Sequence, residues 1–170
     1  YDAKGNQTSV FNAALGTTSS TTYNQYSSPT LLTNMIGVTQ TIAYDASFMP
    51  SSIQDKLGTR GSFTYFSNGS LKTQTDGNGK LTAFTYDPYG NQLSETVPLS
   101  HATTYTYDAL GRLTSTDAAT KQTRFGYDAL GHVKSITDTL NFVTTYGYDP
   151  SGNKTSEKDA RNYTTTYLYN

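Results

Sequence analysis

Aromatic and polar residues alternate along short stretches of the chain, with the period of two that is typical of a β-strand whose two faces differ. In residues 103–107, Tyr105 and Tyr107 alternate with threonines, and a second alternating stretch follows at residues 112–116. Between them, residues 108–111 have Asp at the first position and Gly at the fourth. Asp accepts backbone N–H bonds and Gly adopts positive φ, so the pattern predicts a β-hairpin closed by a turn with a bulge.

The hairpin pattern recurs about every 21 residues. A Tyr, here called an anchor tyrosine, stands immediately before each break, at Tyr1, Tyr23, Tyr44, Tyr65, Tyr86, Tyr107, Tyr127, Tyr148 and Tyr169. Asp after the anchor and Gly four places after it mark the turns, at Asp2, Gly5, Asp45, Gly69, Asp87, Gly90, Asp108, Gly111, Asp128, Gly131, Asp149 and Gly152. A second set of turn residues lies ten places before an anchor, at Asn34, Asp55, Asp76, Asp117, Asp138 and Asp159.

Stacking of these units predicts the fold class. A lone hairpin is marginal in water, so the hairpins must pair with one another. We expect an all-β fold in which tandem hairpins of about 21 residues form one spiralling antiparallel sheet of about 16 strands, a β-solenoid or the wall of a hollow shell. Residues 1–170 form a single array of eight units, which we expect to be an excerpt of a longer chain. Units between about 23 and 64 are degenerate, and we expect looser turns there.

The composition at first suggests disorder, and the repeat explains why that suggestion is misleading. Leu, Ile, Val and Phe make up only about 17% of the residues, while Thr and Ser make up about 28%. A disordered chain also has a high net charge, whereas the net charge here is −1. The chain has 15 Tyr residues, which supply apolar area that the aliphatic count misses, and Tyr and Phe at fixed positions of the repeat lie opposite a face of Thr, Ser, Gln and Lys.

Several function classes are excluded by simple counts. With 12 basic and 13 acidic residues, the chain lacks the basic excess that binds a phosphate backbone, so we expect no nucleic-acid partner. No apolar run approaches the roughly 20 residues of a membrane-spanning helix. The absence of Cys excludes thiol catalysis, disulfides and cysteine-ligated zinc.

The remaining chemistry-bearing residues predict no enzyme, cofactor or metal. His101 and His132 lie in different phases of the repeat, and neither has a recognisable triad around it. Residues 76–79 begin like a calcium loop, but the EF-hand ligand pattern and its Gly do not follow. The aspartates recur in equivalent turn positions, and Glu95 and Glu157 are the only glutamates, so no differentiated acid–base pair is indicated.

Two features leave surface roles open. Rows of Tyr can stack on sugar rings, although packing of the tyrosines within the sheet is the simpler interpretation. Four Asn-x-Ser/Thr sequences are weak candidates for glycosylation, at Asn6, Asn68, Asn153 and Asn162.

The repeat resembles the YD-repeat, or RHS-repeat, family. Residues 107–113 and 127–133, Tyr-Asp-Ala-Leu-Gly-Arg-Leu and Tyr-Asp-Ala-Leu-Gly-His-Val, are similar to its YDxxGRL signature, and the resemblance extends over the whole chain. The family includes RHS polymorphic toxins, the C component of insecticidal toxin complexes, wall-associated proteins and teneurins. The resemblance implies a long sheet that spirals into a shell or barrel, which in the toxins encloses the toxin segment.

From the resemblance we expect a non-catalytic structural scaffold that encapsulates a toxin or forms an extracellular barrel. Its expected partners are the rest of its own parent chain, an enclosed toxin cargo or like repeats in an assembly, and cell-surface glycans. The expected location is secreted or at the cell surface. The alternatives are a segment of an extracellular adhesin or filament built from stacked repeats, and a carbohydrate-binding surface.

Overall fold

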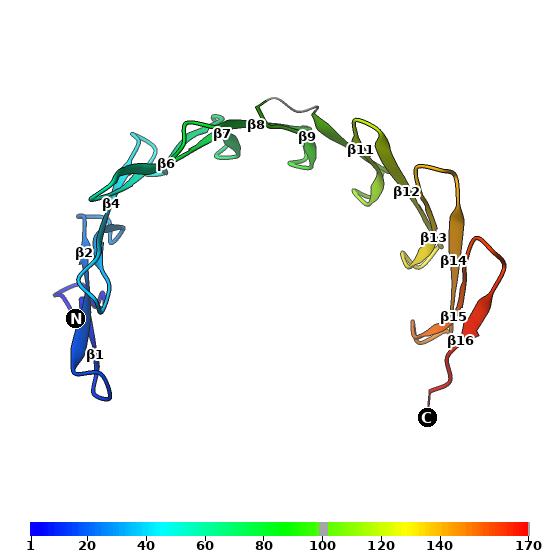
Figure 1. Cartoon of the computed structure of the whole chain (residues 1–170), viewed down its shortest axis with the longest axis horizontal. Helices are drawn as coiled ribbons and strands as arrows, with labels where there is room; N and C mark the ends of the chain where they lie inside the picture. The colour runs from blue at the N-terminus through cyan, green and yellow to red at the C-terminus, as the bar shows by residue number, and fades with distance from the viewer. Residues whose placement is uncertain (99–101, 170) are drawn as a thin grey trace. The chain divides into compact units, whose positions relative to one another are not determined.

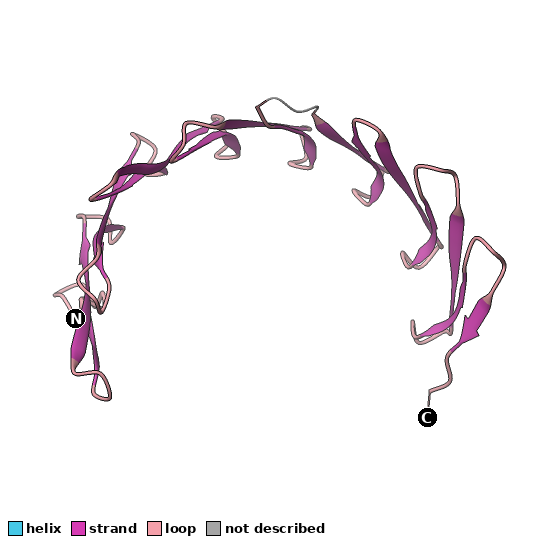
Figure 2. Ribbon diagram, viewed as in Figure 1, coloured by secondary structure: helices cyan, strands magenta, loops and turns pink. Residues whose placement is uncertain are grey.

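A computed structural model describes residues 1–98 and 102–169, and in this part of the chain every regular element is a β-strand (Figure 2). The strands follow one another in chain order in a 16-stranded antiparallel sheet, which confirms the predicted all-β fold of tandem hairpins. They are β1 (Ser9–Asn12), β2 (Thr17–Tyr23), β3 (Pro29–Thr33), β4 (Thr39–Tyr44), β5 (Pro50–Asp55), β6 (Gly58–Tyr65), β7 (Leu71–Asp76), β8 (Leu81–Tyr86), β9 (Gln92–Thr96), β10 (Thr103–Tyr107), β11 (Leu113–Ala118), β12 (Lys121–Tyr127), β13 (Val133–Thr137), β14 (Val143–Tyr148), β15 (Lys154–Lys158) and β16 (Thr164–Thr166).

The chain divides into two compact units, an N-terminal unit of Tyr1–Ala83 and a C-terminal unit of Phe84–Asn170. The boundary falls within β8. Each unit is built from the same hairpin, in which an even-numbered strand ends at an anchor tyrosine and the next odd-numbered strand returns (Figure 1).

A β-bulge immediately before the anchor tyrosine is common to the hairpins. In the β10–β11 hairpin Thr106 pairs with Ser115, but Tyr107 pairs with Leu113, so Thr114 is the extra residue. The register shifts at the equivalent point before Tyr23, Tyr44, Tyr65, Tyr127 and Tyr148. A bulge re-aims the side chains on either side of it, and here it sets the direction of the anchor ring.

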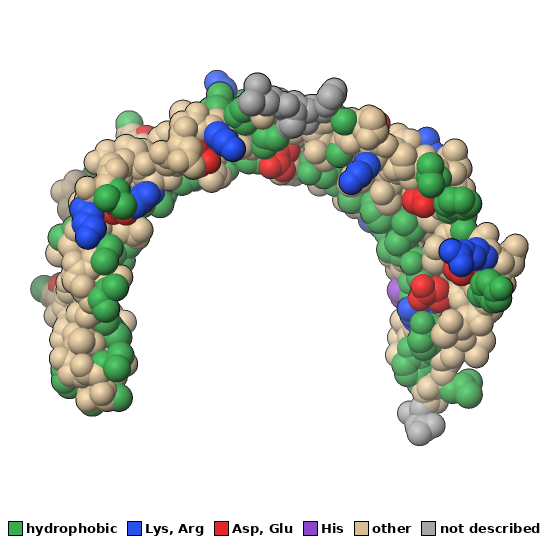
Figure 3. Space-filling model, in the orientation of Figure 1, with side chains coloured by type: hydrophobic (Ala, Val, Ile, Leu, Met, Phe, Trp, Pro, Cys, Tyr) green, Lys and Arg blue, Asp and Glu red, His purple; other side chains and the backbone are tan. Residues whose placement is uncertain are grey.

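The two faces of the sheet differ as the alternation predicts. Hydrophobic side chains gather along one face of the C-terminal unit (Figure 3). On the other face, hydroxyl groups pair across strands, with Thr106 Oγ1 2.7 Å from Ser115 Oγ and Thr85 Oγ1 2.6 Å from Ser94 Oγ. Such Thr–Thr and Thr–Ser pairs add roughly 0.2–1 kcal/mol each to an antiparallel ladder.

Each unit is a single layer of strands, and its described residues form no hydrophobic core. Among the described residues only Gly61 is buried, and the anchor tyrosines within the strands are half-buried. A lone sheet of this kind draws its stability from backbone ladders and from contacts between neighbouring hairpins, as in other repeat proteins. The contacts between hairpins are therefore the features that decide whether the chain folds.

The expectation of looser turns in the degenerate units is wrong. At Asn24, the side-chain oxygen accepts the N–H groups of Tyr26 and Ser28 at 2.9 and 3.0 Å, and Asp45 accepts two N–H groups in the same way. The missing Gly is replaced by Ser27 (φ 64°) and Phe48 (φ 63°). The turn hydrogen bonds hold these residues in the left-handed region, which costs an ordinary residue about 1–2 kcal/mol.

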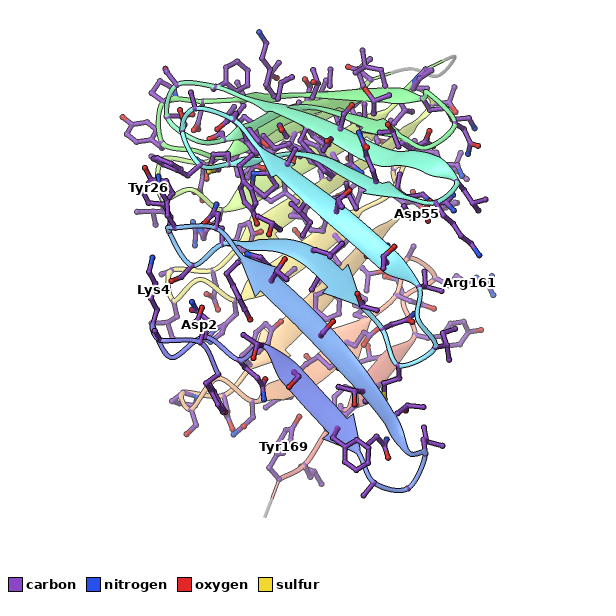
Figure 4. All side chains as sticks on the ribbon, turned by 90° about the vertical axis from the view of Figure 1, so that its left-hand side faces the viewer. Asp2, Lys4, Tyr26, Asp55, Arg161 and Tyr169 are labelled. Atoms are coloured by element: carbon purple, nitrogen blue, oxygen red, sulfur yellow. The ribbon has the colours of Figure 1, made fainter. Side chains whose placement is uncertain are left out.

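Turns at the opposite edge of the hairpins use two geometries. In Figure 4, Asp2, Lys4 and Tyr26 lie at one edge of the N-terminal unit and Asp55 at the other. Asp76 begins a turn like those that follow the anchors. At Asp55 the strands pair up to Gly58, which leaves a tight two-residue loop, and Asp117 lies within an equally tight hairpin.

Candidate functional site

The anchor tyrosines join each hairpin to the one before it through their hydroxyl groups. Tyr107 Oη donates to the backbone carbonyl of Gln92 at 2.9 Å, and Tyr148 Oη donates to that of Val133 at 2.9 Å. In every such bond the acceptor lies six residues after the preceding anchor. The other pairs are Tyr23–Gln7, Tyr44–Pro29, Tyr65–Pro50, Tyr127–Leu113 and Tyr169–Lys154.

These hydroxyl bonds were not predicted from the sequence, although the sequence carries a signal for them. All nine anchors are Tyr, whereas the position two residues earlier holds Phe, Tyr, Ile and, at Thr21, a threonine. If the ring alone mattered, Phe would serve equally well at the anchor. The exclusive use of Tyr indicates that the phenol hydroxyl has a partner, and a neutral hydrogen bond of this kind contributes about 1 kcal/mol.

The predicted turn residues lie at the edge formed by the anchor turns. Asp108 Oδ1 accepts the N–H groups of Leu110 and Arg112, both at 2.9 Å, and the N–H of Gly111 donates to the Asp108 carbonyl at 3.0 Å. Asp2, Asp45, Asp87, Asp128 and Asp149 occupy the same position. Positive φ is found at Gly5, Gly69, Gly90, Gly111, Gly131 and Gly152.

Most of these aspartates also hold the side chain of the residue after the turn Gly. Asn6, Asn91 and Asn153 donate their amide Nδ2 to Oδ2 of Asp2, Asp87 and Asp149 at 2.8–2.9 Å. These side-chain bonds, helped by backbone N–H bonds, hold the pKa of the three carboxyl groups below its usual range. For Asp108 the largest cause of the lowered pKa is the backbone N–H of Arg112.

Near the end of the chain a lysine lies between two tyrosine rings. Lys154 Nζ is 4.5 Å from the ring centroid of Tyr167 and 5.6 Å from that of Tyr146, and it donates to Glu157 Oε2 at 2.8 Å. The Glu157 bond raises the pKa of Lys154 and lowers the pKa of Glu157. This cluster ties adjacent strands together through a cation–π contact and an ion pair.

Burial of the tyrosines gives a testable dependence on alkaline pH. Desolvation raises the pKa of Tyr44, Tyr65, Tyr107 and Tyr146 above the usual 10.0. A raised pKa means that folding favours the neutral phenol, so this stabilisation is complete below about pH 10 and is lost as the pH rises through the folded-state values. Circular dichroism and tyrosinate absorbance recorded together should show strand loss accompanying ionisation. Ionisation of all tyrosines with an unchanged β spectrum would contradict this assignment.

The residues weighed for catalysis and metal binding are not brought together. His132 lies beside Asp128 in a turn, and His101 lies outside the described residues. Glu95 lies on β9 and Glu157 on β15. Within residues 1–98 and 102–169, no group of three or more His, Asp or Glu side chains is placed to hold a metal ion.

The four candidate glycosylation sites fall into two classes. Asn6 and Asn153 use their side-chain amides to hold Asp2 and Asp149. Asn68 and Asn162 are exposed, and Asn162 has positive φ in the turn that precedes β16. A glycan on either of the first two asparagines would be attached to the amide nitrogen that donates to the turn aspartate.

Shallow grooves lie between successive anchor turns. The groove between the turns that begin at Asp87 and Asp108 has a volume of about 750 Å³ and is lined by Tyr89, Leu93 and Tyr105. Tyr89 is 91% exposed. Groups such as Asp87 and Asn91 also line it, but they already bond to each other. Of the described residues, none belongs to a helix long and apolar enough to cross a membrane.

Comparison with protein families finds one family model, described as RHS Repeat. It matches residues 67–102, 107–140 and 127–164, which together make up more than half of the chain. No curated protein matches the sequence.

Comparison with solved structures finds chains of similar fold. They include a crystal structure of TcdB2-TccC3-TEV (TM-score 0.76, 19% identity), a Photorhabdus luminescens Tc holotoxin pore (0.75, 20%) and a crystal structure of TcdB2-TccC3 without its hypervariable C-terminal region (0.76, 19%). Each match covers 88% of this chain but only 9–10% of the other chain. At this identity the likeness shows the fold, and this chain spans about a tenth of the length of those chains.

Proposed function

The chain belongs to the RHS repeat family, and on that premise we propose that it is a non-catalytic stretch of the wall of a β-shell that encloses a toxin segment. The RHS repeats themselves make the chain a structural repeat scaffold. The observation that carries the finer proposal is the single-layer sheet, whose aromatic face is half-buried and covered by no second layer among the described residues. A partly exposed apolar face is typical of a surface that binds another part of the protein or a partner.

The bonds between hairpins supply the mechanism. Backbone ladders close the wall, anchor hydroxyl groups fix each hairpin to the one before it, and Asp-to-backbone bonds define the turns. The similar fold in Tc toxin structures supports this role, as does the even distribution of the stabilising contacts along the chain. Within the proposal the parent protein is secreted or lies at the cell surface, and its partners are the rest of its own chain and the enclosed segment.

Protease protection in the full-length protein tests the enclosure. We expect the enclosed segment to resist cleavage, and to become sensitive when Tyr127 and Tyr148 are both replaced by Ala, because these changes remove two anchor bonds in succession. The control is Tyr89→Ala, which alters an exposed ring and should leave protection intact. A full-length protein in which no segment outside the repeats is protected would contradict the shell.

The adhesin and carbohydrate alternatives have distinct outcomes. An adhesin or filament would show end-to-end stacking by electron microscopy, with no enclosed density. A carbohydrate surface would bind a glycan array and lose that binding on Tyr89→Ala, since Tyr89 is a highly exposed ring that lines the groove between the Asp87 and Asp108 turns. The anchor tyrosines fit sugar stacking less well, because their hydroxyl groups already have backbone partners.

A further inference from the structure

The residue after the turn Gly also bridges successive hairpins in the C-terminal unit. Arg112 Nε donates to Asp108 Oδ2 at 2.7 Å within its own turn. Its guanidinium carbon lies 4.6 Å from the ring centroid of Tyr127, the next anchor, and Nη1 donates to the carbonyl of Asp128 at 3.4 Å. Arg112 therefore joins the β10–β11 hairpin to the following one through a permanent positive charge.

His132 occupies the same position one repeat later. Its Nδ1 lies 3.0 Å from Asp128 Oδ2, and its ring is stacked on Tyr148, with centroids 4.7 Å apart and planes 23° apart. The Nε2 edge faces the next turn, where a Cβ built on Gly152 would lie 3.0 Å away. The imidazole thus contacts its own turn and the next anchor ring, and its Nε2 edge lies close to the next turn.

Solvent reaches the His132 ring, and charged groups of both signs lie around it. The His132 and Asp128 side chains are 28% and 30% exposed, and an open groove of about 480 Å³ lies beside them. Strand β13 contributes the ammonium of Lys134, and the flanking turns contribute the carboxylates of Asp128 and Asp149 and the guanidinium of Arg112. The titratable and charged groups facing this region are Asp128, Asp149, Lys134, Tyr146, Tyr148 and Arg112.

We propose that His132 makes the contact between the β12–β13 and β14–β15 hairpins pH-sensitive, so that mild acid tightens it. A neutral imidazole gives Asp128 an ordinary hydrogen bond, whereas an imidazolium adds a charge-assisted bond and a cation–π contact with Tyr148. Histidine is the side chain whose usual pKa, about 6.5, places this change near neutrality. The same position holds Asn6, Asn91, Arg112 and Asn153 in other repeats, none of which titrates in that range.

The aspartate partner stays ionised over the same range. Desolvation raises the pKa of Asp128, but the bonds from His132 and Leu130 outweigh it and hold the pKa below its usual value. Protonation of the imidazole therefore adds a cation beside a carboxylate that is already negative. We therefore expect the contact between the two hairpins to become more stable as the pH falls through the usual titration range of histidine. The added stability is lost as the pH rises again.

Hydrogen exchange of the intact protein, measured by mass spectrometry near pH 5.5 and pH 7.5 and corrected for intrinsic rates, tests the proposal. For the amides of the β14–β15 hairpin we expect protection about three- to tenfold higher at the lower pH, the size expected for one charge-assisted contact. The β10–β11 hairpin, which is joined by Arg112, serves as the internal reference and should not change.

Variants that copy residues from other repeats of the chain show whether the pH dependence comes from His132. H132R copies Arg112 and should be protected equally at both pH values, while H132N copies Asn91 and should be weakly protected at both. H101N removes the other histidine and should leave the pH dependence in place. The proposal fails if the wild-type hairpin shows no pH dependence, if the dependence persists in H132N, or if it disappears in H101N.

Discussion

Replacement of Tyr107 by Ala is expected to destabilise the C-terminal unit by about 2–3 kcal/mol, somewhat less than truncation of a fully buried aromatic side chain. Two losses add together. The half-buried ring no longer packs against its neighbours, and the hydrogen bond from its hydroxyl to the Gln92 carbonyl disappears. Since each hairpin contacts only its neighbours, we expect exchange of the β9–β11 amides to increase most.

Two further substitutions separate the contribution of the Tyr107 ring from that of its hydroxyl group. Tyr107→Phe keeps the ring and removes the hydroxyl, so it should cost about 1 kcal/mol. Tyr89→Ala removes a ring that is 91% exposed and should stay within about 0.5 kcal/mol of the wild type. Denaturant unfolding followed by circular dichroism gives all three values. Equal losses for Tyr107→Ala and Tyr89→Ala would show that the anchor bond does not hold the hairpins together.

Replacement of Gly111 by Val is expected to cost about 1–3 kcal/mol through backbone strain. Gly111 has a φ of +76°, in the left-handed region that a β-branched residue rarely adopts. Open space surrounds the site, because a Cβ there would meet nothing closer than the Asn91 side chain at 3.8 Å. The cost therefore comes from the φ angle and not from a clash. Thermal or denaturant unfolding of the purified protein measures it.

The control substitution at the same position is Gly111→Asn. Asn141 and Asn162 occupy the equivalent turn position in other turns, with φ of 63° and 69°. Asn tolerates the left-handed region better than other L-residues, so Gly111→Asn should cost well under half as much as Gly111→Val. If Val and Asn destabilise equally, the strain explanation is wrong and a steric one must replace it.

The fold could be predicted from the sequence because one signal is repeated many times. Alternation around each anchor predicts two strands, and Asp and Gly at fixed positions predict the turn between them. Because the pattern recurs in eight units, a weak or ambiguous pattern in one unit does not change the predicted fold. The exception shows the limit of this reasoning. A turn without Gly at its fourth position, such as Asp45–Phe48 in a degenerate unit, is expected to be loose, but the bonds accepted by Asp45 hold Phe48 at positive φ. In this turn the hydrogen bonds outweigh the low preference of Phe for positive φ.

The contacts between hairpins could not be predicted in the same way. The partner of the Tyr107 hydroxyl is a backbone carbonyl 15 residues earlier, and no side-chain pattern marks a carbonyl. Likewise, the stacking of His132 on Tyr148 depends on how two hairpins pair across β13 and β14. Only the four-residue spacing between Asp128 and His132 was visible, and it indicates a contact within one turn.

The backbone acceptor of the anchor hydroxyl has a consequence for how such a chain changes over generations. Pro29, Pro50, Gln92, Leu113, Val133 and Lys154 serve equally well as acceptors. Because the main chain supplies the carbonyl, the side chain at that position is free to drift without breaking the bond. A duplicated or deleted unit of about 21 residues would find the same acceptor in its new neighbour. Recombination between repeats can therefore lengthen or shorten the array while every new junction keeps its anchor bond.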